Sequence, residues 1–304
     1  PPATAVIRLQ KDGKADLYVG AADIGTGTRT ALIQIAAEEL GLAVGDIRII
    51  NADTELTSYT LPSYGSLTLA SSGPAVRRAA FACRRQLVSL AAGMLQTDEK
   101  NILLADGNAT RPAAKKIPAE SVPVGKLVGL MPSQEIVTQG EREGNPSGLA
   151  LKAYAAQFLA VDVDTQSGKI SIAELVAVNE SGRVVNPVTC ASQQIGGVTM
   201  GLGMGLIEER VYDRATGKPL NANLSDYKIP TIVDQPGQMQ TAMVEVPYEA
   251  NAIGSKGLGE PPIIPTAAAL ANAVFDAVGV RMDKLPLSAA RVWNAIYSLE
   301  EKSG

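Results

Sequence analysis

The sequence predicts an α+β fold made of two mixed α/β subdomains. Short β-type runs flank turn signals in both halves of the chain, and Gly-rich loops lead into helical patterns rich in small apolar residues. Strands and helices also mix without the regular spacing of a parallel α/β protein. We expect a first subdomain at 1–110, a linker or crossing segment at 111–148, and a second subdomain, which carries Glu260, at 149–304.

The first subdomain begins with a predicted hairpin, because β-type runs at 6–9 and 16–19 flank Lys11-Asp12-Gly13. A Gly-rich turn at 22–28 then precedes a predicted helix at 29–40, which Gly41 can end. The elements expected after it are a strand at 47–50, a loop at 58–72 and a helix at 75–94.

Residues 111–148 contain five prolines among charged residues with little periodicity, which favours a linker. The second subdomain then opens with a predicted hairpin, 155–163 and 169–178, around Gln166-Ser167-Gly168. The elements expected after it are a helix at 191–209 preceded by Asn186-Pro187, a strand at 243–246 ended by Pro247, a Gly/Pro-rich loop at 254–262, and a helix at 267–278 capped by Thr266.

The composition excludes several classes of protein. Hydrophobic residues make up 46% and charged residues 19%, which is typical of a globular protein. A net charge of -4 gives no electrostatic attraction for nucleic acid, and no apolar run approaches the roughly 18 residues of a membrane span. Since the chain has no histidine, acid–base chemistry must use carboxylates, Lys, Tyr or Cys.

The two cysteines, Cys83 and Cys190, lie far apart and form no CxxC pair, so we expect no disulfide between them. The chain opens with Pro1-Pro2 and a strand follows at once. We therefore expect it to start inside a longer protein, or to have been processed or split. We expect a cytoplasmic location, with the periplasm as the alternative if an export signal has been removed.

Four loops of small residues are candidates for binding a phosphate-bearing ligand, because glycine allows close approach and helix starts expose backbone N–H groups. Individually, the first three are better explained as a tight turn, a plain loop and a Gly-rich helix packed on a neighbour than as binding sites. The four loops are Gly25-Thr26-Gly27-Thr28, Gly65-Ser66-Leu67-Thr68, Ser192-Gln193-Gln194-Ile195-Gly196-Gly197 and Gly254-Ser255-Lys256-Gly257-Leu258-Gly259-Glu260.

Glu260 is the most informative residue of the fourth loop. It stands between Gly259 and Pro261, and the Pro261-Pro262 pair stiffens the chain that leaves it. A carboxylate fixed there, just ahead of a helix, is either a helix cap or a catalytic group. The residues alone leave both interpretations open.

The segment 255–262 resembles the loop that carries the active-site glutamate in molybdenum hydroxylases of the xanthine dehydrogenase/aldehyde oxidase family. The segment 23–30 resembles that family's Gly-rich segment beside the pterin, where Gln often stands at the position of Thr26. Residues 65–68, with 72–76 after them, resemble its small-residue cofactor loop. Residues 192–197 resemble the segment whose Gln contacts the cofactor. All four occur in the family's order, and the chain resembles the C-terminal half of its molybdenum-binding subunit.

The resemblance implies that Glu260 is the catalytic base of an enzyme that oxidises an aldehyde or an N-heterocycle. The added oxygen comes from water, and hydride passes to molybdenum. The implied cofactor is molybdenum with molybdopterin in its cytosine dinucleotide form, and no side chain of this chain is expected to bind the metal. The implied cofactor-binding residues are Gly25, Thr26, Gly27, Thr28, Gly65, Ser66, Leu67, Thr68, Gln193, Lys256, Gly257, Leu258 and Gly259.

The resemblance also implies partners. Nothing here resembles the N-terminal half of the subunit, two cysteines are too few for an iron–sulfur cluster, and no GxGxxG segment is present for a flavin. We therefore expect a chain or segment with that half, a 2Fe–2S subunit, an FAD subunit and a small-molecule substrate. The alternatives are a cofactor-free structural paralogue and a nucleotide- or solute-binding module. If the four loops share one ligand, Gly27, Ser66, Gln193 and Gly257 converge on one cleft between the subdomains.

Overall fold

The computed structural model describes residues 2–114, 117–144 and 151–303. The chain forms two compact units, and it passes between them several times. The first unit comprises Pro1–Lys152, Gly182–Asn186 and Val246–Gly257, and the second comprises Ala153–Ser181, Pro187–Glu245 and Leu258–Gly304. Both units combine helices with open sheets, so the α+β prediction is confirmed.

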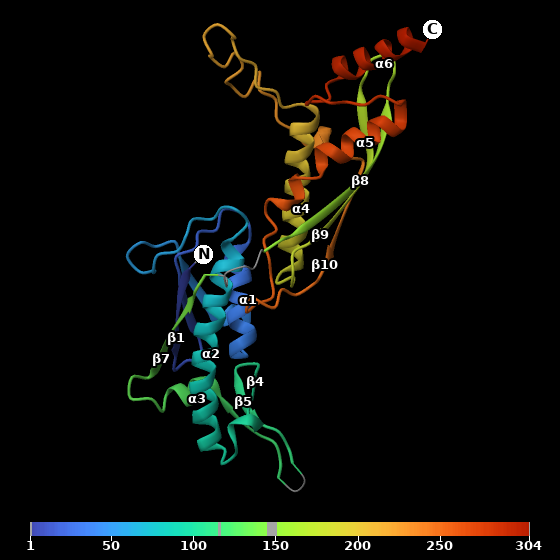
Figure 1. Ribbon diagram of the computed structural model, residues 1–304. Helices are drawn as coiled ribbons and strands as arrows, with labels where there is room; N and C mark the ends of the chain where they lie inside the picture. The colour runs from blue at the N-terminus through green and yellow to red at the C-terminus, as the bar shows by residue number, and fades with distance from the viewer. Residues whose placement is uncertain (1, 115–116, 145–150, 304) are drawn as a thin grey trace. The chain divides into compact units, whose positions relative to one another are not determined.

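The first unit is built on a four-stranded sheet in the order β3-β2-β1-β7. Figure 1 labels two neighbouring strands of this sheet, β1 and β7. Strand β1 is antiparallel to both β2 and β7, while β2 is parallel to β3. Residues alternate along β1 between buried and less buried positions, so that one face of the sheet belongs to the core. The strands are β1 (Ala3–Gln10), β2 (Ala15–Val19), β3 (Ile47–Asn51) and β7 (Glu135–Arg142).

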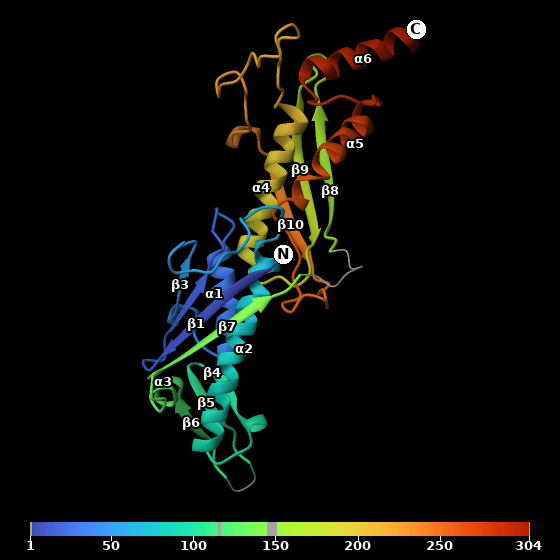
Figure 2. The same cartoon turned by 60° about the vertical axis from the view of Figure 1, so that its left-hand side comes forward.

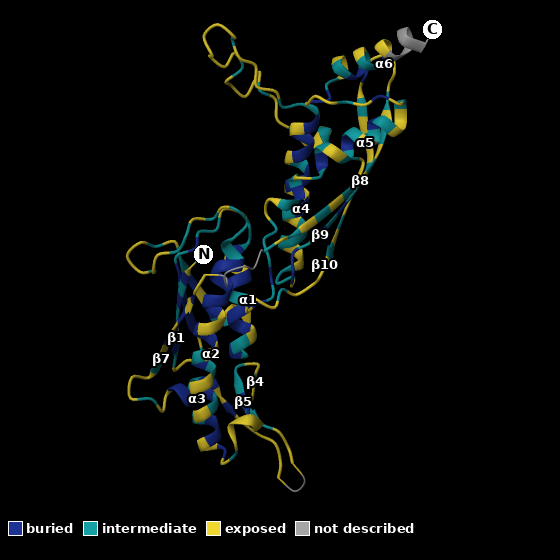
Figure 3. Ribbon diagram, in the orientation of Figure 1, coloured by how far each residue is buried: buried dark blue, intermediate teal, exposed yellow. Residues whose placement is uncertain are grey.

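Two helices, α1 (Thr28–Leu40) and α2 (Thr68–Met94), pack on this sheet and on each other, and Figure 2 shows α2 running beside β7. Their inward residues are among the buried positions coloured in Figure 3. Gly41 ends α1 in the left-handed conformation, as predicted. The smaller elements of the unit are η1 (Val44–Asp46), η2 (Glu99–Asn101), α3 (Val124–Val128) and a three-stranded sheet of β4 (Leu103–Ala105), β5 (Asn108–Arg111) and β6 (Glu120–Pro123).

Two predictions for this unit are wrong. The linker predicted at 111–148 contains β6, α3 and β7, and β7 pairs with β1 along its whole length. The alternating burial of β7 was hidden in the sequence because Thr138 and Arg142 occupy buried positions while the apolar Val137 is exposed. Helix α2 also begins at Thr68 rather than at 75, because it continues through Pro74. Residues 115–116 and 145–148 of the predicted linker lie outside the described residues.

The second unit has a three-stranded sheet in the order β10-β9-β8, which carries the predicted second hairpin. Strands β8 and β9 are antiparallel, while β10 is parallel to β9. Helix α4 packs on β9 and β10, and α5 packs on β8 (Figure 2). The elements are β8 (Tyr154–Val163), β9 (Ile170–Glu180), α4 (Pro187–Leu206), η3 (Ile232–Asp234), β10 (Gln238–Val244), η4 (Pro261–Ile263), α5 (Thr266–Val278) and α6 (Ala289–Ser303).

Several boundaries in this unit differ from the prediction. Helix α4 begins at Pro187, β10 begins at Gln238, and α6 was not predicted. Thr266 does not cap α5: it is the first residue of the helix, it is fully buried, and its hydroxyl donates to the Pro262 carbonyl oxygen at 3.4 Å. Pairing with β9 extends β10 beyond the apolar run seen in the sequence.

One stretch of the described chain, Pro261–Val278, reaches the length and apolar composition of a membrane-crossing helix, although the sequence analysis expected no such run. Within this stretch, Leu270 and Val274 are fully buried in the core of the second unit. Since 22% of the stretch is buried, this packing accounts for part of its apolar composition.

Candidate functional site

The turn at Gly25–Thr28 is organised by Asp23. One carboxylate oxygen of Asp23 accepts hydrogen bonds from the backbone N–H groups of Gly25, at 3.0 Å, and Gly27, at 3.3 Å. The other oxygen accepts from the N–H of Arg29, at 3.1 Å, in the first turn of α1. Partial burial opposes ionisation of Asp23, but these backbone donors outweigh it and hold the pKa of the carboxyl below its usual value.

This arrangement corrects one expectation. The backbone N–H groups of Gly25 and Gly27 are not available to bind a phosphate, because they already donate hydrogen bonds to the Asp23 carboxylate. The groups that remain are hydroxyls: Oγ1 of Thr26 lies 2.8 Å from Oγ1 of Thr28. Asp23 belongs to the segment singled out in the sequence, but its spacing from Gly25 is that of an ordinary Asx turn, so no sequence signal distinguished it.

The second loop, Gly65–Thr68, makes a tight turn into α2. Gly65 and Ser66 both have positive φ, 60° and 57°, and the N–H of Leu67 donates to the Tyr64 carbonyl oxygen at 3.2 Å. A positive φ is uncommon for a residue with a side chain, and here it sets the direction in which the chain enters the helix at Thr68.

The second loop and the residues just before it contact the segments of the first and fourth loops that belong to the first unit. A Cβ atom on Gly257 would lie 2.5 Å from the carbonyl oxygen of Ser66 and 2.6 Å from its Cβ. The two backbones therefore touch, and only glycine fits at 257. Just before this turn, the Ser63 hydroxyl donates to the carbonyl oxygen of Ala22 at 2.6 Å. Residues 22–28, 58–68 and 256–257 are thus brought together within the first unit.

Near these loops lie buried polar atoms without a hydrogen-bond partner, which suit a ligand that forms hydrogen bonds. Among the described residues, the buried hydroxyls of Thr60 and Ser255 have no hydrogen-bond partner. A small cavity of about 10 Å³, the space of roughly one water, is lined by Thr60, Leu67 and Thr68 together with neighbouring residues. Lys256 adds a positive charge, with its Nζ 5.9 Å from the centre of the Tyr248 ring. Hydroxyl donors and a cation suit a phosphate-bearing ligand.

Glu260 lies in the second unit, exposed, directly before the η4 turn. In the described structure its side chain makes no capping hydrogen bond to that turn, and Pro265 rather than Glu260 stands at the start of α5. The helix-cap interpretation is therefore wrong. The segment after Glu260 is held instead by Gln157 of β8, whose Nε2 donates to the Pro262 carbonyl oxygen at 2.5 Å.

Glycines on one face of α4 bring this helix against the glutamate segment. A Cβ on Gly197 would lie 2.7 Å from Cβ of Pro262, and one on Gly205 would lie 3.0 Å from Cδ2 of Leu270. Between them, Gly201 meets Thr266. Each step of four residues along α4 is matched by a step of four residues in the segment that it contacts, from Pro262 to Leu270. Helix α4 and this segment therefore run in the same direction.

One helical turn before Gly197, the half-buried Gln193 lies on the same face of α4, and Leu258, Gly259 and Glu260 belong to the same unit. Ser66 and Gly257 meet within the first unit. The convergence of all four loops on one cleft remains a prediction.

Gln194, next to Gln193, has a structural role that the sequence did not reveal. It is fully buried, and its Nε2 lies 2.9 Å from both the Ala242 carbonyl oxygen and the sulfur of Met243. It continues the stripe of Val198 and Leu202, which pack on β9. Gln194 thus ties α4 to β10, while its neighbour Gln193 is only half-buried.

We expect the two glutamines to respond differently to replacement by leucine. Gln194→Leu leaves the Ala242 carbonyl without its partner and should destabilise the protein by about 1–3 kcal/mol. Gln193→Leu should cost less stability but should lower cofactor content. Thermal melting and molybdenum analysis of both variants check this, and a larger loss of stability in Gln193→Leu would contradict the assignment.

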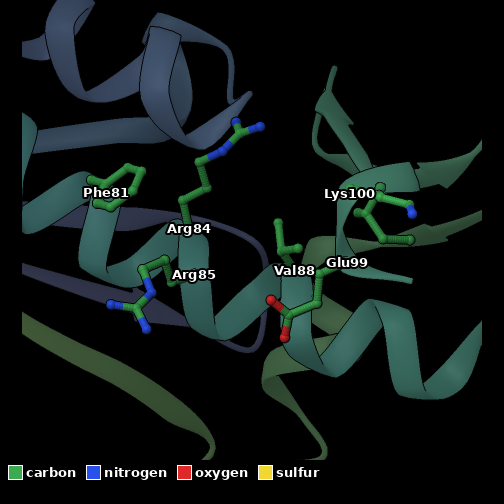
Figure 4. Close-up of a pocket in the computed structure, with 7 residues that line it drawn as sticks. Phe81, Arg84, Arg85, Val88, Glu99 and Lys100 are labelled. Carbon is green, nitrogen blue, oxygen red and sulfur yellow. The ribbon is translucent and has the colours of Figure 1, made fainter. Parts of the chain in front are cut away.

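Other features of the first unit lie apart from these loops. A pocket of about 300 Å³ on α2 is lined by Phe81, Arg84, Arg85 and Lys100 with three other residues, none of them a predicted site residue. Figure 4 shows that the Arg84 and Arg85 side chains point away from each other, so their charges do not converge. Both cysteines are free thiols, as predicted, and burial raises the pKa of Cys83 to about 12.

Comparison with known proteins identifies the family of the chain. The family model of the molybdopterin cofactor-binding domain matches residues 1–236. The putative xanthine dehydrogenase molybdenum-binding subunit XdhA of Escherichia coli is 34% identical over 303 residues, which cover 97% of this chain and 39% of that protein. The nicotine 6-hydroxylase large subunit of Paenarthrobacter nicotinovorans is 30% identical, with 99% and 38% covered.

Among solved structures, quinoline 2-oxidoreductase from Pseudomonas putida superimposes with a TM-score of 0.86 at 28% identity, over 97% of this chain and 38% of that chain. The chain therefore spans about two fifths of the length of the relatives that it matches. Since the family model covers more than three quarters of the sequence, the chain belongs to the molybdopterin cofactor-binding domain family.

Proposed function

We propose that this chain is the part of a molybdenum hydroxylase that binds one side of the cofactor and supplies the catalytic base. The observation that carries the proposal is the course of one loop. Its Gly257 lies in backbone contact with Ser66 of the second loop, and three residues later Glu260 is exposed, directly before the η4 turn. A cofactor held by the glycine part of the loop would thus lie close to a carboxylate.

The residues proposed to hold the cofactor contribute different groups. One hydroxyl of the hydrogen-bonded pair Thr26 and Thr28 and the hydroxyl of Ser66 donate hydrogen bonds, and Lys256 pairs with a phosphate of the cytosine dinucleotide. The backbone of Gly65, Leu67 and Thr68 shapes the second loop, and the backbone of Gly25 and Gly27 shapes the first loop through its hydrogen bonds to Asp23. In the second unit, Gln193 donates its amide, and Leu258 and Gly259 lead to Glu260.

When bound, the cofactor supplies a site that takes up hydride from the substrate and an oxygen that derives from water. Glu260 acts on the proton: an oxygen of its carboxylate accepts the proton that the water-derived oxygen must lose before it attacks an aldehyde or N-heterocycle carbon. The rigid Pro261-Pro262 exit and the bond from Gln157 to Pro262 keep that carboxylate in place. Holding the acceptor still avoids reorganisation at the moment of proton transfer.

The proposal requires partner chains. The chain spans only about two fifths of its relatives, so the remaining contacts to the cofactor come from a further segment or chain. The two electrons then leave through a 2Fe–2S subunit and an FAD subunit. The names of two relatives, a nicotine hydroxylase large subunit and a dehydrogenase complex gamma subunit, are those of multi-subunit enzymes.

Analysis of the complete purified protein tests the proposal. We expect about one molybdenum per chain, and acid hydrolysis should release a cytidine nucleotide. Absence of molybdenum from protein made in molybdate-replete cells would favour the cofactor-free paralogue. Release of a guanosine nucleotide would agree with a molybdenum enzyme but would contradict the cytosine dinucleotide form of its cofactor.

The isolated chain provides a second test. We expect the 304-residue chain alone to show no substrate oxidation, since it lacks the other cofactor contacts and both electron-transfer centres. The measurement is dye reduction with aldehyde and N-heterocycle substrates after incubation with the cofactor. Turnover by this chain alone would contradict the proposed division of the site. The complete complex, assayed in parallel, is the positive control.

A further inference from the structure

Helix α2 contains a gap in its own hydrogen bonding near its start. Pro74 is its seventh residue, and proline has no backbone N–H. In an α-helix that N–H would bond to the carbonyl of the fourth residue before it, which is Ala70. The Ala70 carbonyl therefore lacks its helical partner, although the residue is only 2% exposed to solvent. A buried carbonyl needs a substitute donor.

Asn251 is that donor. Its Nδ2 donates to the Ala70 carbonyl oxygen at 3.0 Å, and Asn251 is itself only 5% exposed. The amide oxygen of Asn251 accepts the N–H of Ile253 at 3.0 Å, so the side chain also shapes its own turn. Both polar ends of this buried amide are engaged, and it joins two segments that are 181 positions apart.

The residues that follow Asn251 pack on the same side of α2. Gly73 has no side chain, and a Cβ there would lie 2.5 Å from Cδ1 of Ile253, which is buried. One turn further along α2, Arg77 donates to the carbonyl oxygen of Ala252. Three consecutive residues of the 251–253 turn are thus fixed on the first turns of α2.

This contact also determines where the glutamate loop begins. Asn251 is bound to Ala70, and six residues later Gly257 lies against Ser66. The loop is therefore attached to the start of α2 at both ends of the segment 252–256. Lys256 lies between these two attachments, and Glu260 follows three residues after the second.

We propose that Asn251 is a positioning residue whose bond to the carbonyl released by Pro74 fixes the glutamate loop on the second loop of the candidate site. The proposal rests on the proposed function for its catalytic consequence, but not for the structural coupling itself. It explains why a proline inside a helix is compatible with a buried helix start: the missing helical bond is replaced by one from the loop. Pro74 and Asn251 should then be energetically coupled.

A double-mutant cycle in the complete protein tests this coupling. The variants are Asn251→Ala, Pro74→Ala and the double variant, and the measurement is hydrogen–deuterium exchange of peptides that cover 252–260. Asn251→Ala should speed exchange there by about tenfold, because the loop loses its bond and Ala70 loses its donor. In the Pro74→Ala background the increase should fall below about threefold, because the backbone N–H gained at position 74 restores the helical partner of Ala70.

Two further variants keep the test decisive. Asn51→Ala removes a comparable amide-to-carbonyl bond, to Ala21 at 3.0 Å, and its effect should be the same with and without Pro74. If Asn251→Ala does not fold, Asn251→Asp keeps the shape and the acceptor for Ile253 but removes the amide donor, and it should loosen the same peptides. Equal effects of the Asn251 substitution in both Pro74 backgrounds, or unchanged exchange in Asn251→Asp, would overturn the proposal.

The catalytic consequence has a separate measurement. With matched molybdenum content, Asn251→Ala should lower the reduction rate at saturating substrate by about tenfold or more, because small displacements of a catalytic group reduce rates strongly. The pH dependence of the rate should keep its shape, since Glu260 still takes the proton. An unchanged rate alongside loosened exchange would overturn the positioning role. Failure of the proposed function would appear instead as missing molybdenum or as an active Glu260→Gln enzyme.

Discussion

Replacing Glu260 with Gln in the complete protein is expected to lower the rate of enzyme reduction by substrate by at least about 10²–10⁴-fold, mainly in kcat. The amide has the shape of the carboxylate but cannot accept a proton from the water-derived oxygen. Because glutamine has the same size and shape and position 260 is exposed, the substitution should leave the fold and most cofactor binding intact. Stopped-flow reduction at matched molybdenum content measures the effect.

The control for this variant is Glu249→Gln, which neutralises another exposed carboxylate in the segment that leads to the same loop. It should reduce at the wild-type rate, since Glu249 has no place in the proposed site. A Glu260→Gln enzyme that is reduced at nearly the wild-type rate would remove Glu260 from the mechanism and contradict the proposed function at its central residue.

Replacing Gly257 with Ala is expected to produce the second large effect, a loss of cofactor. The added methyl group would lie 2.5 Å from the backbone oxygen of Ser66, and no flexible side chain is available to yield. The loop must move away from Ser66 or both backbones must shift, which typically costs about 1–3 kcal/mol for such overpacking. If that energy is drawn from cofactor binding, retention weakens by roughly fivefold to a hundredfold.

Molybdenum and released nucleotide, measured per chain after gel filtration, check this second effect. Gly93→Ala is the matched control, because a Cβ at Gly93 meets nothing within 4 Å and this variant should retain the cofactor fully. Full cofactor content in Gly257→Ala would show that the contact with Ser66 does not shape the binding site. The thermal stability of both variants should be compared to exclude a global loss of fold.

Local sequence patterns were sufficient for the elements whose signals lie within a few residues. The hairpin β1–β2 followed from two β-type runs around Lys11-Asp12-Gly13, and the end of α1 followed from Gly41, because turn and cap geometry depends on adjacent residues. The order of the four loops was enough to indicate the family, and Gly259-Glu260-Pro261 marked the candidate base. No tertiary contact was needed for these inferences.

The start of α2 and the strand β7 required tertiary structure. A proline after a run of small polar residues predicts a loop locally, yet α2 continues through Pro74 because Asn251, 181 positions from Ala70, supplies the missing donor. Strand β7 was hidden among prolines and charges because its hydrogen-bonding partner, β1, lies more than a hundred residues earlier. Pairing energy from distant segments overrides a weak local preference.

The candidate site divides in the same way. The sequence by itself determined which residue types were available: glycines, hydroxyls, one lysine and one constrained glutamate, with no histidine. Only the tertiary structure decided how they are used. The N–H groups of Gly25 and Gly27 donate to Asp23, Gln194 is buried while Gln193 is half-buried, and Gly257 lies against Ser66. Hydrogen-bond partners and backbone contacts depend on three-dimensional proximity, which residue spacing along the chain does not encode.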